Sequence, residues 1–80
     1  MLYNQDILEE LNILMRYNLD TTLTGIKIHH SSADPTLIAA AQRLYNKGLI
    51  TQADGGYLTP MGHEAAEQAQ MLLGLLTPLP

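Results

Sequence analysis

The segment 44–65 constrains the fold more than any other part of this chain of 80 residues. Gly48 follows an amphipathic stretch, and glycine is the usual residue in the left-handed position just after a helix. The dipeptide at 54–55, Asp-Gly, is typical of a tight β-hairpin turn. Thr59 followed by Pro60 is the pattern of a helix N-cap and a first helical position. The segment therefore predicts a helix, a two-stranded hairpin and another helix, in that order.

The residues before this segment predict one more helix and one short strand. Apolar residues recur at helical spacing after Asn4, an acceptable N-cap, and Asp34-Pro35 begins a second helix. Alternating isoleucines between them favour a strand. The expected helices are residues 4–18, 35–47 and 60–76, and the expected strands are residues 25–29, 49–51 and 57–59. The predicted fold is mainly α with a small β-hairpin, in the order helix–strand–helix–hairpin–helix. No repeat or linker divides the single domain 1–80.

The helix expected at 35–47 has two different faces. Five of its residues should be buried: Leu37, Ile38, Ala41, Leu44 and Tyr45. The other face should be exposed to solvent and consists of Thr36, Ala39, Ala40, Arg43 and Lys47.

Composition excludes several classes of protein. The chain has no cysteine, so it has neither disulfides nor thiolate chemistry. No apolar run approaches the roughly 20 residues of a membrane span, and the N-terminus lacks the pattern of a signal peptide. These features predict a soluble, cytoplasmic protein. The net charge is −4, and it is unevenly spread, with −3 in residues 1–20, +2 in 21–53 and −3 in 54–80.

Two short motifs carry a resemblance to a known fold family. The runs Lys47-Gly48-Leu49-Ile50 and Gly56-Tyr57-Leu58-Thr59, with Leu44 and Gly62, resemble the winged-helix domain, most often a bacterial DNA-binding regulator. The resemblance implies that the helix before the hairpin enters the major groove and that the hairpin loop contacts the backbone or minor groove. It implies DNA contacts from five residues of this chain: Lys27, His29, Thr36, Arg43 and Lys47.

The proposed DNA-contacting face departs from that family in its chemistry. Base readout favours Arg, Lys, Asn or Gln, whereas two alanines lie at the centre of this face. The hairpin loop 52–55 carries Asp54 and no base. Three phosphate contacts would give a salt slope of only about −2.7, and a dimer would double it to roughly −5. If the protein binds DNA, we therefore expect it to bind as a dimer.

The whole chain also resembles a family of short bacterial proteins without an assigned function, some labelled as DNA-binding. The run 25–30, Gly-Ile-Lys-Ile-His-His, and the later Gly-Gly-Tyr-Leu-Thr carry this resemblance. The leading interpretation is a small non-enzymatic DNA-binding or transcription-associated protein. The alternative is a winged-helix protein-interaction module without nucleic-acid binding, in which Arg43 and Lys47 are ordinary solvated helix residues.

No motif predicts an enzyme, a metal site or a cofactor. His63 and Glu67 stand four residues apart, but a zinc site needs three or four ligands, so a polar pair on a helix surface is expected. His29 and His30 are adjacent on the expected strand, so one should point inward and the other outward. Glycines 55–56 do not precede a helix, which excludes a phosphate loop, and no catalytic triad is recognisable.

The last helix has more apolar surface than one core-facing stripe needs. Residues 71–76 place five large apolar side chains over roughly 200° of the helix, at 100° per residue. We expect Leu72 and Leu76, with Met61, Ala65 and Ala69, to face the protomer's own core. We expect Met71, Leu73 and Leu75 to form the interface of a homodimer, because such apolar patches usually mark interfaces.

Overall fold

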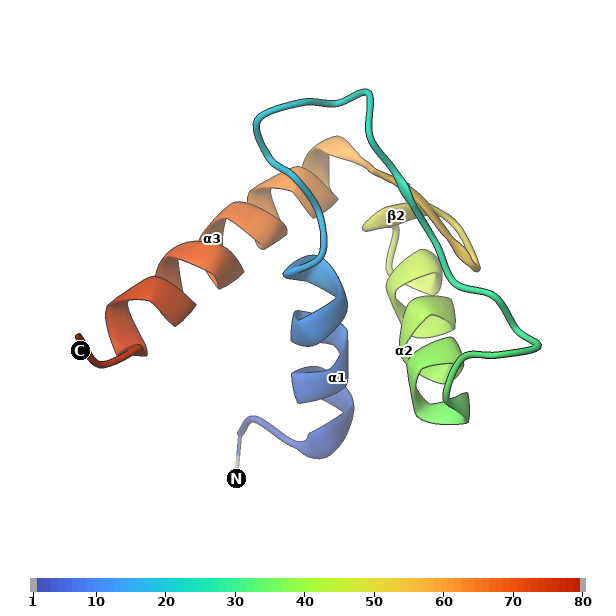
Figure 1. Ribbon diagram of the computed structural model, residues 1–80, viewed down its shortest axis with the longest axis horizontal. Coiled ribbons are helices and arrows are strands. Elements are labelled where there is room, and N and C mark those ends of the chain that lie inside the picture. Colours follow the sequence, from blue (N-terminus) through green and yellow to red (C-terminus); the bar gives the residue numbers. More distant parts are fainter. Residues whose placement is uncertain (1, 80) are drawn as a thin grey trace.

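The computed structural model describes residues 2–79 and contains three helices and one three-stranded antiparallel sheet (Figure 1). The helices are α1 (Gln5–Leu14), α2 (Pro35–Asn46) and α3 (Pro60–Leu76), and the strands are β1 (Ile26–Lys27), β2 (Ile50–Gln52) and β3 (Gly55–Leu58). The predicted fold class and order of elements are confirmed. None of the helices in the described part of the chain is long and apolar enough to cross a membrane.

Side-chain caps determine where the three helices begin. Asn4, Asp34 and Thr59 each accept a hydrogen bond from a backbone amide two or three residues later, at 2.9, 2.9 and 3.0 Å. These bonds satisfy amides that have no partner within the helix. All three predicted N-caps are therefore confirmed.

The first helix is shorter than predicted and ends at Leu14 rather than at residue 18. The amide of Arg16 bonds to the carbonyl of Ile13, which tightens the last turn. The Asn18 side chain then accepts a bond from the amide of Asp20 at 2.9 Å. Such local side-chain bonds compete with the helical ladder, and here they turn the chain away from the helix axis.

The sheet has the order β1-β3-β2, so the central strand β3 pairs with both others. Strand β1 is two residues long. The amide of Ile28 still bonds to the carbonyl of Asp54, the residue opposite it in the register, and the pairing ends there because β3 begins at Gly55. The prediction that one of the two adjacent histidines points inward is wrong. The strand ends before His29 and His30, and both are exposed.

The hairpin turn lies at residues 53–54, one residue earlier than the predicted Asp54-Gly55. Gly55 already belongs to the sheet, where it pairs with Lys27 and Gln52. Its φ of 124° is one that only glycine adopts readily. The predicted left-handed Gly48 after α2 is confirmed by its φ of 78°.

The core lies between α1, α2, the sheet and the first half of α3. Its buried members are Ile13, Leu14, Tyr17, Ile28, Ala40, Ala41, Leu44, Ile50 and Ala66. Two expectations for α2 are wrong, since Ala40 is 0% exposed and Tyr45 is 44% exposed. Ala40 precedes Arg43 and Lys47 by three and seven residues, so it lies on the side of α2 from which these two residues reach Glu10 of α1.

The second half of α3 leads away from the other helices (Figure 1). The expectation that Met61, Leu72 and Leu76 face the core is wrong, because their exposures are 55%, 44% and 70%. The first half of α3 reaches the sheet and the core, where Gly62 lies directly against the carbonyl of Leu49. Further along α3, the Gln70 side chain donates to the carbonyls of Leu14 and Tyr17 at 3.3 and 2.9 Å.

Candidate functional site

Two of the predicted DNA-contacting residues, Arg43 and Lys47, lie in an acid–base cluster between α1 and α2. Glu10 is the centre of this cluster, and its side chain is 8% exposed. Arg43 Nε donates to Glu10 Oε2 at 2.9 Å, and Lys47 Nζ donates to Glu10 Oε1. Arg43 also donates to the backbone carbonyl of Asp6 at 3.2 Å. The cations of α2 therefore hold α1 in place.

Burial alone would raise the pKa of Glu10, because an apolar environment disfavours the charged carboxylate. The hydrogen bonds from Lys47 and Arg43 outweigh burial, so the pKa lies below its ordinary value. The hydrogen bond between Arg43 and Glu10 also raises the pKa of the Arg43 guanidinium. Glu10 is thus ionised at neutral pH, and its charge is balanced inside the protein.

Sequence reasoning did not single out Glu10, although its position gives a signal. It precedes Ile13 and Leu14 by three and four residues, which places it beside the apolar stripe of the helix. A carboxylate at such a position needs a cation when it is buried.

The other three predicted DNA-contacting residues lie elsewhere, and two of them, Lys27 and Thr36, also have acidic partners. Lys27 pairs with Asp54 of the hairpin turn, and this hydrogen bond lowers the pKa of Asp54. The Thr36 hydroxyl donates to Asp34 Oδ1 at 2.8 Å, at the opposite end of α2 from Lys47. His29 is exposed in the loop after β1. The structure thus separates the five residues into groups rather than gathering them into one face.

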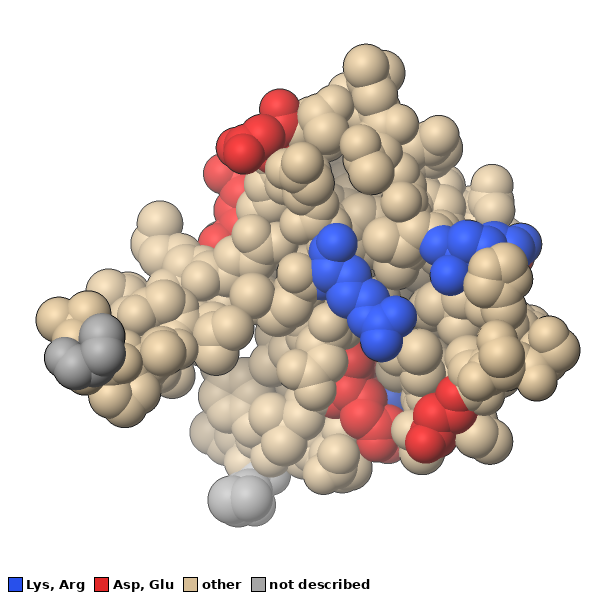
Figure 2. All heavy atoms as spheres, in the orientation of Figure 1, with Lys and Arg blue, Asp and Glu red and all other residues tan. Residues whose placement is uncertain are grey.

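The basic side chains form no continuous patch on the face drawn in Figure 2, where acidic side chains lie close to them. The chain has four Lys and Arg residues. Within residues 2–79, Arg16 alone among them makes no ion pair with an acidic side chain. Ala40, expected at the centre of the reading face, is buried and unavailable to any ligand.

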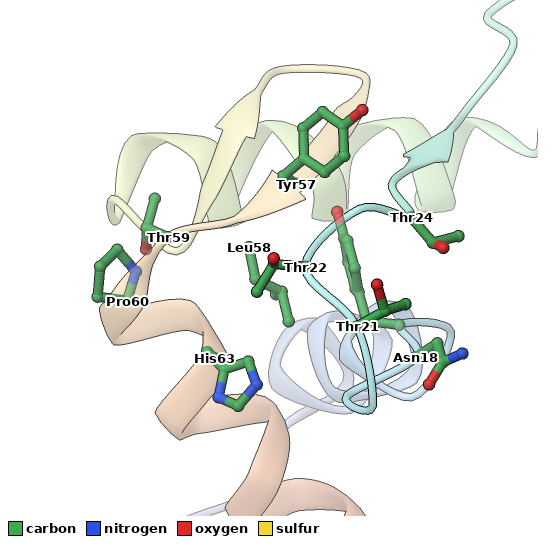
Figure 3. A pocket seen from close by; sticks show the side chains of 10 residues that line it. Asn18, Thr21, Thr22, Thr24, Tyr57, Leu58, Thr59, Pro60 and His63 are labelled. Atoms are coloured by element: carbon green, nitrogen blue, oxygen red, sulfur yellow. The ribbon is translucent and has the colours of Figure 1, made fainter.

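A cavity of about 430 Å³ lies between the loop after α1, strand β3 and the start of α3 (Figure 3). It is lined by Tyr17, Asn18, Thr21, Thr22, Thr24, Tyr57, Leu58, Thr59, Pro60 and His63. Burial raises the pKa of Tyr17 to about 12, and its hydroxyl donates to the carbonyl of Gly56 at 3.3 Å. The lining includes neither Lys, Arg, Asp nor Glu.

Among the residues that line this cavity, His63 has the kind of side chain that acts most often as a general acid or base. Its Nδ1 atom lies 3.0 Å from Glu67 Oε1, one helical turn away on the surface of α3. The expected polar pair is therefore confirmed. The described residues contain no group of three or more side chains that could hold a metal ion.

An apolar groove of about 520 Å³ separates α1 from α3. It is lined by Tyr3, Gln5, Leu8, Leu11, Asn12, Met15, Ala69, Leu72, Leu73 and Leu76, none of which is charged. Of the three expected interface residues, Leu73 faces this groove. Met71 and Leu75 do not line it, and they are 69% and 77% exposed.

Comparison with known proteins gives a family for this chain. A family model, described as a family of unknown function (DUF5669), matches residues 1–77. The chain belongs to this family. No curated protein and no solved structure matches this chain. A family of unknown function transfers no activity, so the function rests on the surfaces described above.

Proposed function

We propose that this chain is a non-enzymatic protein-interaction module of winged-helix-like architecture that associates with a second copy of itself through the second half of α3. One observation carries the proposal. Every residue from Met71 to Leu79 is exposed, and most of these side chains are large and apolar. Exposed apolar patches of this kind mark interaction surfaces in soluble proteins.

The charge distribution favours a second copy as the partner. Residues 68–79 carry no charge, although the chain as a whole carries −4. Two acidic copies repel each other on average, so an uncharged apolar surface is where they can meet. A two-fold axis then covers the patch of each copy with the same patch of the other.

The winged-helix part of the proposal is supported by the order of elements and the pairing of the strands. The hairpin lies between α2 and α3, and β3 pairs with β1 to complete a small antiparallel sheet. The chain departs from the common pattern between α1 and α2, where residues 15–34 contain β1 and no helix.

DNA binding, the leading interpretation of the sequence, has weaker support than protein interaction. Lys27, Arg43 and Lys47 would each have to leave an acidic partner to contact a phosphate. A dimer would also carry a net charge of 2 × (−4) = −8, which repels a polyanion.

Self-association is tested with two double variants that add the same charge. Leu73→Glu/Leu75→Glu places two carboxylates on the exposed end of α3, and glutamate is a good helix former. Thr22→Glu/Leu23→Glu places two on the exposed loop after α1 and serves as the control. Light scattering after size-exclusion chromatography should show a wild type and control that dimerise and an α3 variant that stays monomeric. A monomeric wild type, or an α3 variant that dimerises like the control, contradicts the proposal.

A further inference from the structure

The apolar groove exists because α1 and α3 meet at one end and diverge at the other. The Gln70 side chain donates hydrogen bonds to the carbonyls of Leu14 and Tyr17 at 3.3 and 2.9 Å, where α1 ends. From there the two helices run apart (Figure 1), and the groove of about 520 Å³ lies between them. Leu8 of α1 and Leu73 of α3 both line it, and they are 42% and 51% exposed. Both walls of the groove therefore offer apolar side chains to a partner.

Charged side chains lie outside the groove, and none of its lining residues is charged. On α1, Asp6 and Glu10 both contact Arg43 of α2 instead. On α3, Glu67 pairs with His63, and neither of these residues lines the groove. An occupant of the groove is therefore recognised by apolar contact, and it needs an uncharged surface of its own.

The end of α3 is such a surface, and it is too small to hold a dimer alone. Residues 68–79 carry no charge, and all nine residues in 71–79 are exposed. A standard interface uses roughly 20–30 residues of each partner. The groove adds Ala69 and six residues from the segment 3–15. An interface that includes the groove therefore comes close to the usual size.

We infer that the end of α3 from a second copy lies in the groove between α1 and α3, and that each copy fills the groove of the other. The inference rests on the proposed self-association and adds α1 to its interface. A two-fold axis makes the exchange reciprocal. The groove sides of the two α3 helices then face each other, and α1 of each copy contacts α3 of the other. A helix that lays its apolar face in an apolar groove is a common mode of recognition.

Angular positions on α3 determine which of its residues this arrangement covers. The groove residues of α3 span about 100° of the helix, at 100° per residue: Ala69, Leu72, Leu73 and Leu76. Met71 lies about 150° from the centre of this arc, on the opposite side of the helix. Leu73 is therefore covered by the second copy, and Met71 stays exposed to solvent.

Three variants that each add one carboxylate test the arrangement. Leu8→Glu and Asn12→Glu place it in the α1 wall of the groove. Asn12 is exposed and polar, so its substitution leaves the core intact. Met71→Glu is the matched control, because it places the carboxylate on α3 outside the groove. Glutamate is a good helix former, and circular dichroism at a concentration where the protein is monomeric checks that each variant is folded.

Sedimentation velocity over a concentration series measures the dissociation constant of each dimer. Leu8→Glu and Asn12→Glu should each raise it about tenfold or more, because the new carboxylate would be buried without a partner. Met71→Glu should raise it less than about threefold, through the added charge repulsion alone.

The possible failures of this inference and of self-association differ. A wild-type dimer whose dissociation constant is unchanged in either α1 variant overturns docking in the groove and leaves self-association standing, through the exposed side of α3. A Met71→Glu dimer as weak as that of Leu8→Glu contradicts the arrangement in the same way. A wild type that stays monomeric throughout the series overturns self-association itself, and docking in the groove with it.

Discussion

At the scale of single residues, Glu10 places one negative charge between two helices, where Arg43 and Lys47 both donate hydrogen bonds to it. The arrangement explains why cations on an exposed helix are not available to a ligand. Each is held against α1 by the same carboxylate, and opening the cluster would leave that carboxylate buried without a partner.

We expect Glu10→Gln to lower the free energy of unfolding by roughly 1–3 kcal/mol, as for hydrogen bonds to charged groups. The amide keeps the shape of the side chain and loses its charge. Arg43 and Lys47 remain partly exposed, so water limits the cost. Urea denaturation measures the change. Glu64→Gln, on the exposed surface of α3, is the matched control and should leave stability nearly unchanged.

Stability should also depend on pH through the same residue. The folded-state pKa of Glu10 lies below its ordinary value of 4.5, as do those of Asp34 and Asp54 relative to 3.8. A lowered pKa contributes stability above the ordinary value, and this stability is lost as pH falls through the folded-state pKa. We therefore expect the thermal midpoint to fall between pH 5 and pH 3. The thermal midpoint of Glu10→Gln should fall less over this range. An equally steep fall in the variant would exclude a role for Glu10.

At the scale of secondary-structure elements, Thr59 joins the end of one helix to the start of the next. Its hydroxyl oxygen accepts a hydrogen bond from the amide of Gly62 at 3.0 Å, and its O–H group donates one to the carbonyl of Gly48 at 2.6 Å. One side chain thus caps α3 and satisfies the carbonyl of the glycine that ends α2.

Thr59→Ala should therefore destabilise the protein by about 0.5–2 kcal/mol, the usual cost of losing an N-cap, and toward the upper end because two bonds are lost. Thr59→Ser keeps the hydroxyl and should retain most of the stability. Thermal or urea denaturation of the two variants separates the hydroxyl from the methyl group. Equal losses in both variants would show that packing, rather than capping, is the contribution of this residue.

Local chemistry made the starts of the three helices predictable from sequence. Asn4, Asp34 and Thr59 bind amides within three residues of themselves, so their role follows from sequence neighbours alone. The partners of Glu10, Arg43 and Lys47, lie 33 and 37 residues away along the chain, so the sequence around Glu10 does not show them. The prediction of the buried face of α2 was wrong at two residues for a similar reason. The position of α1, which lies far from α2 along the chain, determines that Ala40 is buried and Tyr45 is not.

The candidate site was predicted only in part, again for reasons of distance along the chain. The exposed apolar end of α3 could be read from its composition, since residues 71–76 exceed what one core-facing stripe can use. Which of these residues line the groove could not be predicted, because the groove depends on where α1 lies.

At the scale of the whole molecule, the balance of charge decides which class of partner is plausible. The chain has eight acids against four bases, and three of the four bases are paired with acids within it. Non-specific DNA binding depends on cations that release the counterions of the phosphates, and few are available here.

We expect fluorescence anisotropy of a labelled random duplex to show no binding, even at low salt where non-specific attraction is strongest. Binding that weakens with salt and is lost in Arg43→Glu/Lys47→Glu, with the fold intact, would restore the DNA interpretation. The same titration with Glu10→Gln tests the cause, because releasing the two cations should favour any electrostatic attraction that exists.

We propose that a second copy of the chain covers the exposed end of α3. Sedimentation equilibrium of the wild-type protein, over a concentration series reaching several hundred micromolar, measures this self-association. We expect an average mass that rises with concentration from 8.8 kDa toward 2 × 8.8 = 17.6 kDa. A mass that stays at 8.8 kDa throughout the series contradicts it.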